Sequence, residues 1–174
     1  MGRNVIALDD LTVNNVGVFK KINNVVLACK YPEEWYQQSL DSPDSLVQLA
    51  FYAELPVGAI KAKSFNNNMS HPTFNESANS SKILQKAPNC VYIESLAVLD
   101  KYRDLGIGSQ LVEWLVEQTR NRFIHEIMIH VEARNSKIVE WYAKRGFVKG
   151  EIVVDYYKDQ GLQDPDALIM KRTI

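Results

Sequence analysis

The chain has 174 residues, enough for one domain with a substantial hydrophobic core. Hydrophobic residues make up 46% and charged residues 24%, and the net charge of −1 gives no global reason to bind nucleic acid or an anionic membrane. Because no apolar stretch resembles a signal peptide or spans a bilayer, we expect a cytoplasmic protein with no membrane partner.

Two cysteines, Cys29 and Cys90, are present. In a cytoplasmic protein both are expected to stay reduced. Neither has a second cysteine or a histidine at the spacing of metal ligands, so the sequence predicts no metal site.

The first third of the chain predicts a strand followed by two helices. Residues 5–8 have the pattern of a short strand, and apolar residues recur at helical spacing over residues 13–26, with Thr12 as the expected cap. Pro32 suits the start of a second helix over residues 32–40. The two helices are joined by a loop over residues 27–31.

A β-hairpin and an insertion follow. Residues 46–53 and 57–65 are β-like runs separated by a short turn, which indicates an antiparallel pair. The stretch that begins at residue 66 is rich in Asn and Ser and poor in large apolar groups. It cannot bury enough surface to offset its ordering entropy, so we expect a mobile surface insertion over residues 66–87 within a single domain.

The remaining chain predicts a strand at residues 90–99, a helix from residue 109, a strand at 126–133 and a helix at 137–145. Gly146 is the expected left-handed stop of that last helix. Two strands, at residues 147–157 and 167–171, complete the chain. The predicted order is β-α-α-β-β-β-α-β-α-β-β, a mixed sheet of the α/β class.

A glycine motif lies at the turn between the strand at 90–99 and the helix after it. Arg103, Gly106 and Gly108 have the form Arg-x-x-Gly-x-Gly. Glycines there let successive backbone N–H groups point at one spot, and the helix adds its partial positive end, so a phosphate fits. The patterns of a Rossmann loop and of a P-loop are both absent. The alternative is a turn that only joins strand to helix.

Tyr92 and His130 are the candidate bases. Tyr92 shares one face of its strand with Glu94 and Leu96, and His130 lies on the strand expected beside it. The pair could meet in one cleft with a water between them, and so deprotonate an amine. Each also has a simpler interpretation, since a strand tyrosine is often a packing residue and an isolated histidine a structural one.

The glycine motif resembles the pyrophosphate loop of the GNAT superfamily of N-acetyltransferases. The segment from Asn135 to Gly146 and Phe147 resembles a second block of that superfamily. The resemblance implies a GNAT fold, which is a seven-stranded, mostly antiparallel, splayed sheet flanked by about four helices, with acetyl-CoA as cosubstrate. The residues that it places at acetyl-CoA are Leu96, Ala97, Val98, Leu99, Arg103, Asp104, Leu105, Gly106, Ile107, Gly108, Ser109, Asn135 and Tyr142.

Within the superfamily the chain looks like the NatE family of N-terminal acetyltransferases. That resemblance implies transfer of acetyl to the N-terminal amine of nascent chains that begin with Met. It also implies the auxiliary and catalytic subunits of NatA as partners and, through them, the ribosome. Tyr92 and His130 would hold the water that deprotonates the amine. The residues expected at the peptide are Leu27, Cys29, Tyr31, Glu94, Tyr156 and Tyr157.

The chain departs from the NatE pattern at two sites. The family's Phe-Pro-Val run in the methionine pocket is replaced by Leu27-Ala28-Cys29, and Glu94 stands where a family member can have an apolar substrate contact. An alternative hypothesis is therefore a weakly active or inactive interaction subunit of the NatA complex. A third, an acetyltransferase for small amines or lysine side chains, agrees less well with the tyrosines that would grip a peptide main chain.

Overall fold

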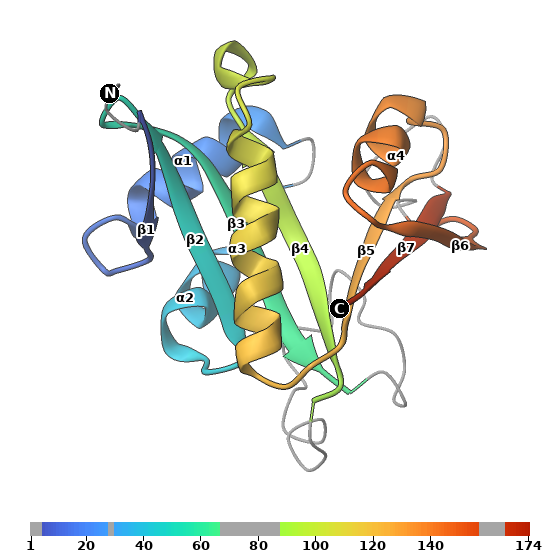
Figure 1. The fold of residues 1–174 in the computed structure, drawn as a ribbon. Coiled ribbons are helices and arrows are strands. Elements are labelled where there is room, and N and C mark those ends of the chain that lie inside the picture. Colours follow the sequence, from blue (N-terminus) through green and yellow to red (C-terminus); the bar gives the residue numbers. More distant parts are fainter. Residues whose placement is uncertain (1–4, 28–29, 67–87, 157–165) are drawn as a thin grey trace.

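A single seven-stranded sheet forms the centre of the computed structural model, which describes residues 5–27, 30–66, 88–156 and 166–174 (Figure 1). The strand order is β1-β2-β3-β4-β5-β7-β6. All neighbours are antiparallel except β4 and β5. The predicted mixed, mostly antiparallel sheet is confirmed.

The observed elements follow the predicted order, with ends that shift by a few residues. The strands are β1 (Ile6–Asp10), β2 (Ser45–Tyr52), β3 (Leu55–Phe65), β4 (Cys90–Val98), β5 (Glu126–Glu132), β6 (Val148–Val153) and β7 (Ala167–Thr173). The helices are α1 (Val16–Val26), α2 (Glu33–Asp41), α3 (Ile107–Asn121) and α4 (Ser136–Ala143), with a 3-10 turn at Asp100–Tyr102. Almost all of the predicted insertion, residues 67–87, lies outside the described residues.

Helix α1 begins later than the sequence predicts. Thr12 does not cap it; the Thr12 carbonyl accepts the N–H groups of Asn15 and Val16 in a turn that precedes the helix. The Asn15 side chain accepts the Thr12 N–H at 2.7 Å. Local side-chain to backbone bonds of this kind compete with helix, so the first turn of the predicted helix is lost.

Each face of the sheet is covered by its own helices. Figure 1 shows α3 in front of β2, β3 and β4, with α1 and α2 behind them. On the α3 face the main core includes Leu111 and Leu115 of the helix and Ile60 of β3. On the opposite face Phe19 of α1 and Trp35 of α2 pack with Leu49 and Ala59 of the sheet. These four residues form a second core cluster with Tyr36.

The sheet opens between β4 and β5. These two strands pair only from Val91 to Ile93 of β4, opposite Ile127 to Ile129 of β5, and then diverge, as Figure 1 shows. In the part of the chain that the structure describes, one edge of β4 beyond Ile93 therefore has no neighbouring strand. An opening of this kind in the middle of a sheet leaves backbone groups available to a ligand.

The register between β3 and β4 shifts beside the same opening. Lys61 pairs with Ser95 and Ala62 pairs with Ile93, so Glu94 is an extra residue with no partner on β3. Such a bulge releases the extra residue from the ladder and redirects its side chain. Glu94 thus has no strand-pairing partner on β3 or on β5.

Candidate active site

The predicted pair Tyr92 and His130 meet on the face of the sheet that carries α1 and α2. The Tyr92 hydroxyl and His130 Nδ1 lie 2.8 Å apart, within hydrogen-bond distance, and each residue is only 8% exposed. The expectation of a water between them is wrong for this structure, because the two side chains touch directly. The parallel register of β4 and β5 explains this contact, since it puts both residues on one face just where the strands begin to separate.

Tyr156 completes the cluster. Its hydroxyl lies 3.0 Å from that of Tyr92, and its ring stacks on His130 with the centroids 4.2 Å apart and the planes at 4°. The sequence placed Tyr156 at the peptide; the structure puts it against both candidate bases. Tyr157, which was also predicted at the peptide, lies outside the described residues.

Tyr31 lies at the start of the segment that leads into α2. Its hydroxyl donates to the Glu94 carbonyl at 2.7 Å, which is the carbonyl released by the β4 bulge. Its ring stacks on Trp35 with the centroids 3.8 Å apart. Tyr31 is therefore fixed beside the opening of the sheet, on the same side as the Tyr92 cluster. Of the other loop residues predicted here, Leu27 follows α1 and is half-buried, while Cys29 is outside the described residues.

The Glu94 carboxylate is held by two lysines of β3. Lys61 Nζ lies 3.3 Å from one oxygen and Lys63 Nζ 3.6 Å from the other. Lys61 is 2% exposed, and burial lowers its pKa to about 8, partly offset by Glu94. The position that the resemblance associated with an apolar substrate contact is here part of a buried ion pair.

The predicted phosphate loop leads into α3 as the glycine motif requires. Gly106 precedes the helix with φ +86°, a conformation that glycine adopts without strain. The first turn of α3 contains no acidic residue and no side chain caps it, so its N–H groups can face an anion. Asp104, a carboxylate inside the loop, has an exposed side chain. These features fit the diphosphate of CoA.

Arg103 lies differently from a phosphate-binding arginine. Its Nε donates to the Val98 carbonyl at 3.2 Å, and its guanidinium pairs with Asp100 at 2.9 Å. Both contacts turn the side chain back along the 3-10 turn. Because more than half of Arg103 is exposed, this pair is weak and the side chain remains able to move.

Arg145 places a second guanidinium at the first turn of α3. Its Nε and Nη2 donate to the Ser109 hydroxyl at 2.9 and 2.7 Å, and the group lies 3.6 Å from the centre of the Trp141 ring. Gly108 allows this packing, because a Cβ there would come within 2.8 Å of Trp141. No role for Arg145 was predicted from the sequence. The feature that could have pointed to it is an arginine immediately before Gly146, the glycine predicted to stop α4.

The other residues predicted at acetyl-CoA are divided between core and surface. Asn135 caps α4 by accepting the Ile138 N–H at 3.2 Å, and Tyr142 is buried between Trp141 and Phe147. On β4 and in the loop, the buried members are Ala97 and Ile107; Leu96, Val98 and Leu99 pack partly against the core, and Leu105 is exposed.

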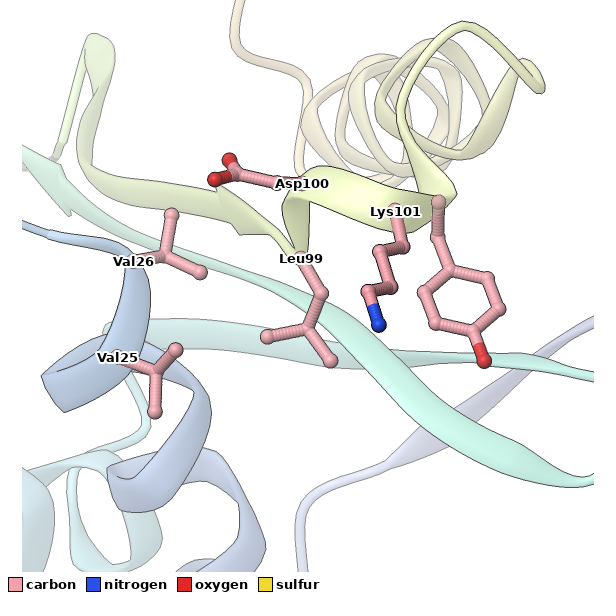
Figure 2. Close-up of a pocket in the computed structure, with 6 residues that line it drawn as sticks. Val25, Val26, Leu99, Asp100 and Lys101 are labelled. Atoms are coloured by element: carbon pink, nitrogen blue, oxygen red, sulfur yellow. The ribbon is translucent and has the colours of Figure 1, made fainter.

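A pocket of about 280 Å³ lies between the end of α1 and the turn after β4. Figure 2 shows Val25 and Val26 on one side of Leu99 and Lys101 on the other, with the Asp100 side chain extending toward the side of Val26. The pocket borders the predicted cofactor loop and is separate from the Tyr92 cluster. Val25, Val26 and Leu99 give it an aliphatic side, which does not by itself select a ligand.

Cys90 is fully buried next to Glu126, with Sγ 3.5 Å from Oε1. Burial and that carboxylate raise the pKa of the Cys90 thiol, so it is a poor nucleophile. Among the residues that the structure describes, no group of three or more His, Cys, Asp or Glu could hold a metal ion. Nor is any helix in the described ranges long and apolar enough to cross a membrane.

Comparison with known proteins agrees with this geometry. Residues 19–147 match the Acetyltransferase (GNAT) family. This chain belongs to that family. Its members use acetyl-CoA.

Full-length relatives of this GNAT chain include a probable N-acetyltransferase, san, of Drosophila melanogaster, which is 29% identical over all of this chain and 84% of its own length. N-alpha-acetyltransferase 50 of Danio rerio is 25% identical, over 97% of this chain and 89% of its own. Among solved structures, Arabidopsis thaliana Naa50 in complex with the bisubstrate analogue CoA-Ac-MVNAL is 25% identical, with a TM-score of 0.77, covering 98% of this chain and 99% of that one. The GNAT fold predicted from the sequence is confirmed.

Proposed function

We propose that this GNAT chain is an N-terminal α-amino acetyltransferase that acts on peptides beginning with Met. The observation that carries the proposal is the direct Tyr92–His130 contact at the point where β4 and β5 separate. Tyr31 and Tyr156 lie on the same face of the sheet. The Naa50 relatives, one of them bound to a bisubstrate analogue that contains MVNAL, support the choice of peptide.

Tyr92 and His130 form a route for the proton of the amine. A peptide α-amine has a pKa of about 8, so only part of it is neutral near pH 7 and a modest base suffices. Tyr92 Oη takes the proton while its own proton moves to His130 Nδ1, which lies 2.8 Å away. The stacked ring of Tyr156 keeps the imidazole in this orientation.

Acetyl-CoA supplies an acetyl group that is already activated as a thioester. The first turn of α3 and the loop from Arg103 to Ser109 would hold its phosphates, with Arg145 adding positive charge beside Ser109. We expect direct transfer to the amine without an acyl-enzyme, because Cys90 is buried and un-ionised. Detection of acetyl-Cys90 during turnover would contradict this mechanism.

The site's tyrosines favour a peptide over a small amine. Tyr31 and Tyr156 are held by hydrogen bonds and by stacking, and such fixed hydroxyls suit the main chain of an extended peptide. On the same resemblance, we propose that the chain works in the cytoplasm with the auxiliary and catalytic subunits of NatA, close to the ribosome.

The first test is calorimetric binding of acetyl-CoA, followed in the same sample by turnover on a peptide that begins Met-Leu. We expect binding and turnover. Binding without turnover, with or without added NatA subunits, would favour the interaction-subunit alternative. Equal rates on a peptide whose N-terminus is blocked but which carries a free lysine would contradict α-amine specificity.

A further inference from the structure

A buried lysine lies under the peptide side of the site, and the proposed chemistry does not use it. Lys61 of β3 is 2% exposed and contacts two residues there. Its ammonium donates to the Trp35 carbonyl at 3.1 Å, lies 3.8 Å from the centre of the Trp35 ring, and pairs with Glu94 at 3.3 Å. Three contacts of this kind hold the ammonium in one position.

The partners of Lys61 are also the partners of Tyr31. Tyr31 stacks on Trp35 and donates to the Glu94 carbonyl. The contacts therefore form a closed ring of four residues, which we call the Lys61 ring: Lys61, Trp35, Tyr31 and Glu94. Lys61 therefore acts on Tyr31 in two ways. It holds the Trp35 indole on which Tyr31 stacks, and it holds Glu94, whose carbonyl accepts the Tyr31 hydroxyl.

Stability alone does not account for this ring. Burying an ammonium and a carboxylate carries a large desolvation penalty, and well-packed apolar residues of similar size are often at least as stable. A buried pair does, however, impose one arrangement, because any other leaves a charge without a partner. Among the described residues, Lys63, which is about one-quarter exposed, is a second cation in reach of Glu94. Without Lys61, the carboxylate would turn toward Lys63 at the rim.

We propose that Lys61 is a positioning residue for the peptide: by holding Glu94 and Trp35, it keeps the Tyr31 hydroxyl where it can take the peptide main chain. This inference rests on the proposed function. Lys61 does not touch the reacting atoms, so its loss acts on peptide binding and leaves the transfer step and acetyl-CoA binding in place.

The test is a cycle of substitutions assayed with the Met-Leu peptide. We expect Lys61→Met to raise the peptide KM roughly tenfold, the scale of one lost hydrogen bond. We expect kcat and the KM for acetyl-CoA to change less than twofold. In a Tyr31→Phe background, Lys61→Met should raise the peptide KM no further, because the residue it positions has lost its hydroxyl. Lys21→Met, on the exposed side of α1, is the matched control and should behave as wild type.

A second variant protects the test against misfolding. Lys61→Arg keeps a cation that can pair with Glu94 and lie over the Trp35 ring, so the peptide KM should stay within about threefold of wild type. A Lys61→Arg variant that binds acetyl-CoA as wild type does, yet shows the raised peptide KM of Lys61→Met, would overturn the proposal. So would an unchanged KM in Lys61→Met, or additive effects of Lys61→Met and Tyr31→Phe. If wild type acetylates no Met-starting peptide, the proposed function is wrong, and the inference about Lys61, which depends on it, is wrong as well.

Discussion

Tyr92 and His130 are joined by one short contact, and their loss should therefore appear in kcat. Tyr92→Phe removes the hydroxyl that faces Nδ1, and His130→Ala removes the group that receives its proton. We expect each variant to lower kcat by roughly 10²-fold or more, the usual effect of losing a general base. Because they act as a unit, the double variant should be little worse than either single one.

Tyr156→Phe is the matched comparison for these two variants. It keeps the ring stacked on His130 and loses only the hydroxyl 3.0 Å from Tyr92. We expect a smaller drop in kcat, within about tenfold, from the loss of one hydrogen bond. Steady-state rates near wild type in Tyr92→Phe and His130→Ala would rule out their assignment as bases.

Lys61 should make the stability of the fold depend on pH in a defined direction. Its pKa is about 8 in the folded chain and about 10.4 when the side chain is exposed in the unfolded chain. Between these values the unfolded chain holds a proton that the folded chain has lost, so the free energy of unfolding rises with pH. Between pH 8 and 10, we expect the free energy of unfolding of wild type to rise, relative to that of Lys61→Met, by up to about 1 kcal/mol per pH unit.

Urea unfolding of both proteins at several pH values measures this difference. The raised pKa of Cys90 acts in the opposite direction above pH 8.5, since the thiol then ionises only in the unfolded chain. That contribution is common to both proteins and cancels in the comparison. If the difference in free energy of unfolding between the two proteins stayed constant from pH 8 to 10, burial would not lower the pKa of Lys61.

The approach of α3 to α4 depends on one missing side chain. A Cβ at Gly108 would lie 2.8 Å from Trp141, whose ring is held from above by Arg145. We expect Gly108→Ala to cost about 1–3 kcal/mol of folding free energy, as overpacking does. It should also weaken acetyl-CoA binding, because the first turn of α3 must move. Chemical unfolding and calorimetry measure the two effects.

Gly17 gives the matched control for that substitution. It lies inside α1, and a Cβ there meets nothing within 4 Å. Gly17→Ala should therefore raise the free energy of unfolding by up to about 1 kcal/mol through helix propensity. If both alanine variants proved equally stable, the tight contact between Gly108 and Trp141 would not exist in solution.

Binding of acetyl-CoA should stabilise the molecule as a whole. The cofactor loop, the open edge of β4 and α4 all belong to one sheet and its helices, so a ligand that binds them binds only the folded chain. At 100 times the Kd, such a ligand adds about 2.7 kcal/mol. For a chain of this length that is roughly 5–10 °C in Tm.

Differential scanning fluorimetry tests this stabilisation, with inorganic phosphate at the same concentration as the control for charge alone. Phosphate should leave Tm nearly unchanged, because it cannot reach from the loop to the β4 edge. An equal shift with phosphate would mean that α3 binds anions without recognising CoA. If saturating acetyl-CoA did not raise Tm, the assignment of the cofactor site would be wrong.

The sequence alone determined the order of helices and strands, the glycine loop before α3 and the candidates Tyr92 and His130. These follow from local patterns: apolar spacing, strand alternation, and glycines at a turn. The start of α1 was the exception, since side-chain bonds in the turn around Thr12 outweighed a helical pattern.

Only the tertiary structure decided how the site is assembled. The Tyr31–Glu94 bond joins residues 63 positions apart, and Arg145 reaches Ser109 over 36. Such contacts depend on strand register, on the bulge at Glu94 and on side-chain direction across elements. None of these leaves a periodic signal in the sequence. The sequence shows that Lys61 lies in an apolar strand. It does not show that Lys61 pairs with Glu94, whose carbonyl accepts the Tyr31 hydroxyl.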